Sequence, residues 1–206
     1  MVNSRRENLR EALVDAAERT IAAHGLAQLK ARALAREVGC ALGAIYNVFP
    51  DLGALIMAVN SRSFALLDAA LRREADAAMT PDGSQRAVAS RMLIALATGY
   101  LDFAAEHTHR WRALFDFRVP DGQDLPEWHM KEQEALFLHL EAPLAILQPT
   151  LPAAERALLA RSLFSAAHGM VLLGLEGKIV HLPLPYLREQ VALVVAAMGR
   201  GLSADA

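Results

Sequence analysis

Nucleic-acid binding is the chemistry that the side chains of this sequence favour most clearly. Residues 31–49 read ARALAREVGCALGAIYNVF, which predicts a helix at Ala31 to Val38, a turn at Gly39-Cys40-Ala41 and a helix from Leu42 to about Val48. The apolar positions can pack these two helices together, and they leave small and polar residues facing outward. Such a helix–turn–helix unit is the geometry that enters a major groove of DNA.

Six side chains of this unit are candidates for DNA contact. They are Lys30, Arg32, Leu42, Ala44, Tyr46 and Asn47. Lys30 and Arg32 can pair with phosphates, Tyr46 is placed for the same role, and the amide of Asn47 can pair bidentately with adenine. The two aliphatic members can only pack against thymine methyl groups or sugars, so DNA shape would contribute to recognition. In the alternative interpretation, Tyr46 is a half-buried aromatic residue and Leu42 an ordinary packing residue.

Large side chains farther along the chain could line a cavity for a small molecule. Aromatic and thioether groups would form an apolar wall, and a histidine on an otherwise apolar helix would offer a polar contact. The candidates are Tyr100, Phe103, Trp111, Phe115, Trp128, His168 and Met170. The alternative is that the aromatic residues are simply core and that His168 is a hydrogen-bonded core histidine.

Metal and catalytic sites have weaker support. His107 and His109 are two positions apart and would not share a helix face, whereas His129 and His139 are ten apart. The sequence contains no compact Cys/His cluster, no HExxH or GxSxG motif and no phosphate-binding glycine loop. We therefore expect no metal, no cofactor and no catalytic residue. The single cysteine, Cys40, excludes an internal disulfide and is expected to be a packed apolar side chain.

The elements that position these groups are predicted to be helices throughout. Ala and Leu dominate, 54% of the 206 residues are hydrophobic, and no run of alternating β-branched residues occurs. We expect an all-α fold of about nine helices, at 5–24, 31–38, 42–48, 84–106, 110–117, 127–147, 153–175 and 185–202, with a long helix capped by Asp51. Pro143 is expected to kink or split the helix at 127–147.

Charge is distributed unevenly along the chain. Residues 1–60 hold seven Lys/Arg and six Asp/Glu, whereas the whole chain has a net charge of −2. The mild positive balance at the N-terminal end suits DNA binding there. No uninterrupted apolar run approaches the roughly 20 residues of a membrane span, and a polar helix follows Arg5 and Arg6. We therefore expect a cytoplasmic protein with no membrane partner.

Two helices near the C-terminus, at 153–175 and 185–202, are apolar on more than one face. A helix of this kind must bury both faces. One face can meet the rest of the chain, and the other can meet a second copy, which predicts a homodimer through a four-helix interface. The alternative is a helix pair that is wholly internal to one chain.

An ordered set of short motifs runs through the first 60 residues. An amphipathic helix ends at Gly25, the pair Leu34-Ala35 follows, then Gly39, then Gly43-Ala44-Ile45-Tyr46-Asn47-Val48-Phe49, and finally Leu55. In this order the motifs resemble the DNA-binding domain of the TetR (tetracycline-repressor) family of bacterial regulators. Near the C-terminus, Ala167-His168-Gly169-Met170-Val171 resembles the His-Gly motif of one subgroup of TetR ligand domains.

The resemblance implies two domains and a function. A helix-turn-helix DNA-binding head of three helices would occupy residues 5–52, and a ligand-binding and dimerisation body would occupy residues 53–203. The protein would be a bacterial transcription regulator, by default a repressor that a small effector releases from a double-stranded DNA operator. A homodimer would place its two heads in successive major grooves of a pseudo-palindromic site.

The sequence departs from the family pattern at four positions. Lys30 replaces the usual Thr, Ala41 the usual Ser, Val48 a frequent His, and Leu52 the usual Lys. One alternative is therefore a TetR-like fold with weakened DNA binding that acts as a ligand sensor or protein partner. A second alternative is a small helical enzyme that uses the pocket of His168.

Overall fold

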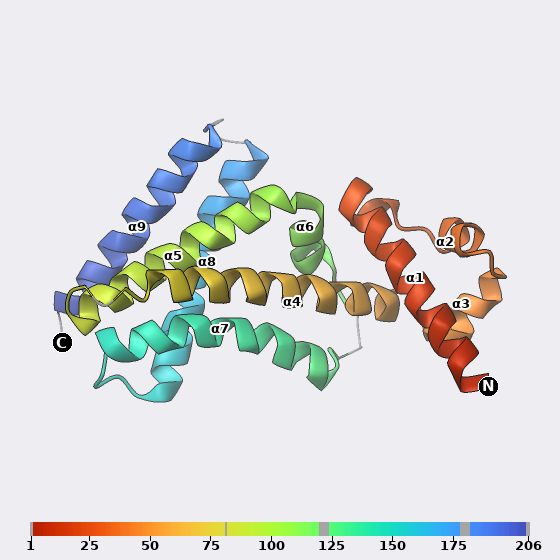
Figure 1. The fold of residues 1–206 in the computed structure, drawn as a ribbon, viewed down its shortest axis with the longest axis horizontal. Coiled ribbons are helices and arrows are strands. Elements are labelled where there is room, and N and C mark those ends of the chain that lie inside the picture. The colour runs from red at the N-terminus through yellow and green to blue at the C-terminus, as the bar shows by residue number, and fades with distance from the viewer. Residues whose placement is uncertain (1, 81, 120–123, 178–181, 205–206) are drawn as a thin grey trace. The chain divides into compact units, whose positions relative to one another are not determined.

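The structure is a computed structural model of the 206-residue chain, and it describes residues 2–80, 82–119, 124–177 and 182–204. Every regular element in these ranges is helical (Figure 1). The elements are α1 (Val2–His24), the 3-10 helix η1 (Leu26–Gln28), α2 (Ala31–Val38), α3 (Leu42–Val48), α4 (Leu52–Ala78), α5 (Gln85–Glu106), α6 (Thr108–Asp116), α7 (Glu127–Leu147), α8 (Ala153–Glu176) and α9 (Leu184–Ala204).

The all-α prediction is confirmed, and most predicted helix ends lie within a few residues of the observed ones. Two details differ: η1 was not expected, and Pro143 lies inside α7, which continues unbroken to Leu147. Of the expected kink or split at Pro143, the split is therefore wrong, and the kink stays a prediction. Leu144 and Leu147 are fully buried, and their packing holds the last turn in place although proline has no N–H to donate.

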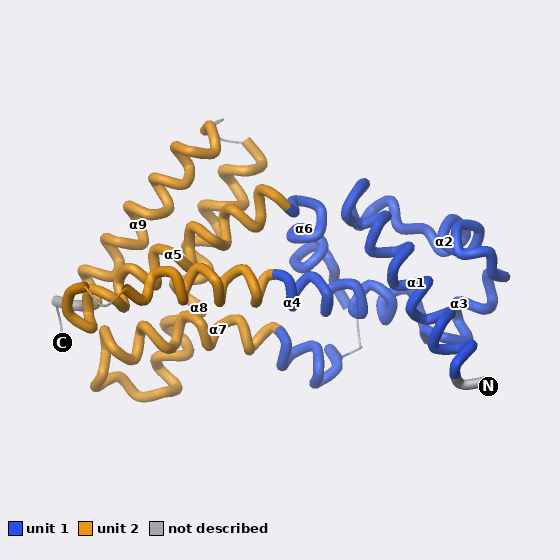
Figure 2. Tube along the Cα trace, viewed as in Figure 1, with its two compact units in different colours: residues 1–66, 107–132 blue, residues 67–106, 133–206 orange. Residues whose placement is uncertain are grey.

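The described chain forms two compact units (Figure 2). Unit 1 comprises residues 1–66 and 107–132, and unit 2 comprises residues 67–106 and 133–206. Helices α4 and α7 each contribute residues to both units. Helix α6, which is remote in sequence from the first three helices, thus belongs to the same unit as they do.

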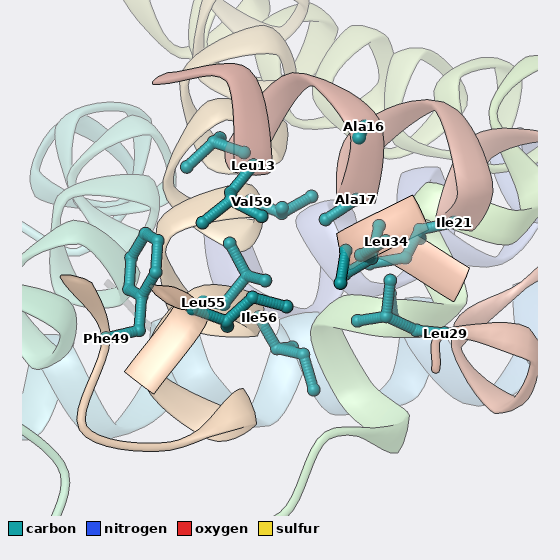
Figure 3. Close-up of a cluster of buried hydrophobic side chains, with 14 residues drawn as sticks. Leu13, Ala16, Ala17, Ile21, Leu29, Leu34, Phe49, Leu55, Ile56 and Val59 are labelled. Atoms are coloured by element: carbon teal, nitrogen blue, oxygen red, sulfur yellow. The ribbon is translucent and has the colours of Figure 1, made fainter. Parts of the chain in front are cut away.

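The core of unit 1 is a cluster of aliphatic side chains around α1 (Figure 3). Leu13, Ala17 and Ile21 are fully buried, as the four-residue spacing along α1 predicts. They pack in one cluster with Ile45 of α3 and Leu55 of α4. Each buried aliphatic side chain of this size contributes roughly 1.5–3 kcal/mol relative to exposure to water. This core fixes the helix-turn-helix segment against α1 and the start of α4.

In unit 2, α5 packs against both α8 and α9, which also pack against each other. The contact between α8 and α9 is close at Gly174, where an added Cβ would lie 2.5 Å from Cδ2 of Leu187. Glycine at this position therefore allows the two helices to approach.

Three helices, α4, α5 and α8, are long and apolar enough to cross a membrane by length and composition alone. The three helices differ in how much of their most apolar 18-residue stretch is buried inside the fold. In α4 and α5 about half of that stretch is buried (44% and 56%), but in α8 only 11% is buried. Most residues of helix α8 are therefore half-buried or exposed within the chain.

Candidate nucleic-acid interface and effector site

The helix-turn-helix unit is built around a tight turn at Gly39. Its φ of 74° lies in the left-handed region, which glycine adopts without steric cost and in which it commonly ends a helix. The N–H of Cys40 donates to the carbonyl of Ala35 at 2.9 Å and closes the end of α2. Cys40 itself is half-buried against the core of unit 1, as expected for a packed side chain. On the inner side, Leu34 and Ile45 are buried and hold α2 and α3 together.

The opposite side of this unit carries the predicted DNA-contacting residues. Lys30, Arg32 and Asn47 are exposed, and Ala44 is half-buried. Leu42 and Tyr46 are 38% and 49% exposed, unusually open for large apolar side chains. The structure therefore places the six predicted side chains on the surface of α3 and around the start of α2.

The positions that depart from the family pattern have visible local consequences. Lys30 and Ala41 precede α2 and α3, and neither side chain caps the helix that follows. A Ser or Thr at such a position accepts a hydrogen bond from a free backbone N–H, which neither lysine nor alanine can do. Helix α4 keeps its cap, because Oδ1 of Asp51 accepts a 2.7 Å bond from the N–H of Ala54, as predicted.

The predicted effector-binding residues divide between the two units. Tyr100, Phe103, His168 and Met170 lie in unit 2, whereas Trp111, Phe115 and Trp128 lie in unit 1. Within unit 2 the structure brings Tyr100 of α5 and His168 of α8 together, with 2.8 Å between the Tyr100 hydroxyl and Nδ1 of His168. Phe103 is buried and Met170 is half-buried in the same unit.

The surroundings of this pair are aromatic. The Phe164 ring stacks on His168 with 5.4 Å between ring centroids, and it meets the rings of Tyr100 and Phe137 edge-on at the same distance. Burial lowers the pKa of His168 below its ordinary value, so the imidazole is neutral near pH 7. The arrangement presents a neutral polar pair on an aromatic wall, which suits a small apolar or aromatic molecule with one polar group.

Phe164 was not among the predicted effector residues, although the sequence carried a signal for it. It lies four residues before His168 on α8 and hence on the same helix face. Phe137 lies on α7, and only the tertiary packing shows that it meets Phe164.

In unit 1 the three predicted residues have different surroundings. Trp111 is buried and lies 5.7 Å from the half-exposed Phe115, measured between ring centroids. Trp128 is exposed and contacts His129 edge-on at 5.2 Å. Trp111 thus acts as a core residue of α6.

A partly buried polar cluster around His129 in unit 1 was not anticipated. His129 is only 2% exposed, and its Nδ1 lies 3.4 Å from Oε2 of Glu132, longer than a good hydrogen bond. The hydroxyl of Ser61 on α4 donates to that carboxylate at 2.7 Å. Burial lowers the pKa of His129, and the neighbouring carboxylate partly opposes this shift. His139, considered together with His129 from the sequence, instead pairs with Asp68 at 2.7 Å.

In the described ranges, no three His, Cys, Asp or Glu side chains are grouped so that they could hold a metal ion. An open groove of about 430 Å³ runs along α4, lined by Asp68, Ala69, Arg72, Arg73 and Asp76. Its charged lining does not suit an apolar effector.

Comparison with known protein families agrees with this geometry. Residues 13–59 match the family described as bacterial regulatory proteins, tetR family, and residues 93–198 match the tetracyclin repressor-like C-terminal domain. The second match alone covers half of the chain. The protein belongs to the TetR family of transcriptional regulators, which are DNA-binding proteins and not enzymes. The comparison with curated proteins gives no match.

Solved structures show the same fold. A protein of unknown function from Rhodococcus sp. RHA1 is 27% identical, with a TM-score of 0.72 and 95% of each chain covered. A tetR-family transcriptional regulator from Streptomyces coelicolor is 22% identical (TM-score 0.59, 96% of this chain and 86% of that chain). The fatty acid degradation regulator FadR from Bacillus halodurans is 18% identical (TM-score 0.60, 90% and 97%).

Proposed function

We propose that this TetR-family regulator is a cytoplasmic homodimer that represses transcription and leaves its operator when a small apolar or aromatic effector binds. Residues 5–52 form the DNA-binding head, and residues 53–203 form the ligand-binding and dimerisation body. The observation that carries the proposal is the outward face of α3, where Leu42, Tyr46 and Asn47 are exposed while Ile45 anchors the helix in the core. A helix held in this way can enter a major groove without rearrangement.

Within this proposal, Lys30, Arg32 and Tyr46 bind phosphates, and Asn47 reads a base edge. Leu42 and Ala44 pack against thymine methyl groups or sugars. Phosphate contacts release counterions, so operator affinity should fall as salt rises. Because this face has only two cationic side chains among its six candidates, we expect the salt dependence to be modest.

The uncovered apolar surface of α8 and α9 supports the dimer. Leu158 and Leu173 of α8 and Leu193 of α9 are exposed, and Leu158 reaches 64%. Only 11% of the most apolar stretch of α8 is buried within the chain. Monomeric soluble proteins rarely leave large apolar patches uncovered. A second copy that packs the same two helices against them would bury this surface symmetrically.

The effector would bind beside the Tyr100–His168 pair of unit 2, with Phe103 and Met170 nearby and Phe164 as an aromatic wall. Trp111, Phe115 and Trp128 remain candidates for a second region in unit 1. Effector binding and operator binding are linked reciprocally: if the effector lowers operator affinity by some factor, the operator lowers effector affinity by the same factor.

The experiment that tests this function is selection of genomic DNA fragments by the purified, folded protein, followed by a salt titration on the best fragment. A two-fold symmetric site that is bound more weakly by Tyr46→Ala supports the proposal. Leu138→Ala is the control, because Leu138 is also a large exposed side chain but lies on α7, outside the proposed DNA and dimer surfaces. Failure to enrich any fragment at low salt would reject it.

A second candidate is a TetR-like ligand sensor with weak DNA binding. The missing side-chain caps at Lys30 and Ala41 favour it, because an uncapped helix start is less stable by about 1 kcal/mol. Under this candidate, Lys30→Thr together with Ala41→Ser would raise operator affinity. The same genomic selection, repeated with the double variant, distinguishes the repressor from the ligand sensor.

A further inference from the structure

Arg62 on α4 lies at the centre of an ion cluster in unit 1. Its Nη1 is 2.7 Å from Oδ1 of Asp15 and 2.5 Å from Oε2 of Glu18, and its Nη2 pairs with Glu11. The three carboxylates follow one another along α1 at spacings of four and three residues, so they occupy one helix face. A single guanidinium therefore spans about two turns of α1.

Helix α6 joins the cluster through Arg110. Its Nη1 is 2.5 Å from Oε1 of Glu18, so Glu18 contacts two arginines that come from different helices. The side chains of Glu18 and Arg110 are only 18% and 19% exposed. Charges shielded from water in this way interact more strongly than an exposed pair does.

Two members of the cluster, Glu18 and Arg62, have pKa values shifted toward their charged forms. Burial tends to raise the pKa of Glu18, but hydrogen bonds and charges from Arg110 and Arg62 together hold it below its ordinary value. The pKa of Arg62 is raised, first by its hydrogen bond with Asp15. Glu18 and Arg62 therefore stay charged near neutral pH.

The cluster adds directional contacts to the packing of the apolar core. The hydrophobic attraction between α1 and α4 is itself non-directional, so in the core only the fit of the side chains sets the register of the two helices. Charge-assisted hydrogen bonds with guanidinium groups depend on geometry. Rotating α1 about its axis, or sliding it along α4, would break the contacts of Arg62 with several carboxylates at once.

We infer that Arg62 and Glu18 are positioning residues that set how the helix-turn-helix is presented to DNA, and thereby restrict the spacing of operator half-sites. Helix α1 packs on α2 and α3, so its orientation determines the direction of the recognition helix. In a symmetric dimer, the two recognition helices must match the separation of the two half-sites. The inference rests on the proposed function, because it needs a dimer on an operator.

The test uses the full-length protein and its selected operator, together with operators that have one base pair more or less between the half-sites. The wild type should bind the altered spacings about tenfold more weakly. Arg62→Met should bind the best operator only slightly more weakly but lose most of this discrimination, to about threefold or less. Arg72→Met is the matched control, because Arg72 lies on the same helix and pairs with Asp68 in an exposed ion pair outside unit 1.

Two further variants guard against a simple folding defect. Glu18→Gln keeps the other two partners of Arg62 and should also relax the spacing preference, whereas Arg62→Lys keeps a charge and should fall between wild type and Arg62→Met. Loss of stability alone would lower affinity for all spacings equally, and that result would overturn the inference. Variants that fold normally and keep the wild-type spacing preference would also overturn the inference. A wild type that binds no operator would instead reject the proposed function itself.

Discussion

Replacing Gly43 by alanine should separate the stability of the fold from its affinity for DNA. Gly43 is the second residue of α3 and is exposed, and a Cβ added there would meet no atom within 4 Å. Its φ is not among the positive values found in the chain. Alanine is therefore expected to stabilise the protein by roughly 0.5–1 kcal/mol through helix propensity, which is about 1–4 °C in Tm for a chain of this size.

The same methyl group should weaken operator binding. Gly43 lies between Leu42 and Ala44 on the part of α3 that we propose meets DNA. Glycine there lets the backbone of α3 approach DNA closely, and a Cβ would push the two surfaces apart. We expect a loss of about tenfold or more in operator affinity, equivalent to about 1.4 kcal/mol. Fluorescence anisotropy with a labelled operator measures the affinity, and thermal unfolding measures the stability.

A glycine with a positive φ serves as a control for this experiment. Gly39 has a φ of 74°, so Gly39→Ala should destabilise the protein although the site has open space. The reasoning is refuted if Gly43→Ala stabilises the protein and binds the operator as tightly as the wild type does.

Three other substitutions test the core and the proposed effector site. Ile45→Ala should destabilise unit 1 by about 2–5 kcal/mol because Ile45 is fully buried, and a loss below about 1 kcal/mol in urea unfolding would contradict this packing. Tyr100→Phe removes the hydroxyl that meets His168, so unfolding free energy should fall by about 0.5–1.5 kcal/mol, and an unchanged value would argue against that bond. The pKa of His168 is lowered in the folded state, so an unfolded chain takes up this proton first and stability should fall as pH drops below about 6.5. His168→Gln should flatten this part of the stability–pH curve, and equal slopes for the two proteins would contradict the shift.

Local chemistry explains why so much of the helical layout could be predicted. The four-residue apolar spacing of α1 gives one face that must be buried, and Leu13, Ala17 and Ile21 lie in the core as that spacing requires. Gly39 and Asp51 mark a helix end and a helix start by their own conformational preferences. Such signals act over a few residues and do not depend on the rest of the fold.

Pro143 shows where local signals fail. Proline disfavours the interior of a helix, yet burial of Leu144 and Leu147 outweighs that cost, and α7 continues. The cost is local and visible in the sequence. The burial of Leu144 and Leu147 depends on the tertiary structure, so it was not visible in the sequence.

One candidate site could likewise be predicted from the sequence, whereas the contacts of the other sites could not. The exposed face of α3 follows from helical periodicity and one buried anchor, Ile45, so the sequence by itself determined which side of the helix is available to DNA. The pairing of Tyr100 with His168, and of Arg62 with the carboxylates of α1, joins residues between 44 and 68 positions apart. Long-range pairs depend on how helices cross and in which register they pack, which no local pattern encodes. The sequence alone therefore determined the helices and the surface of the head, and only the tertiary structure decided which charged and aromatic side chains meet.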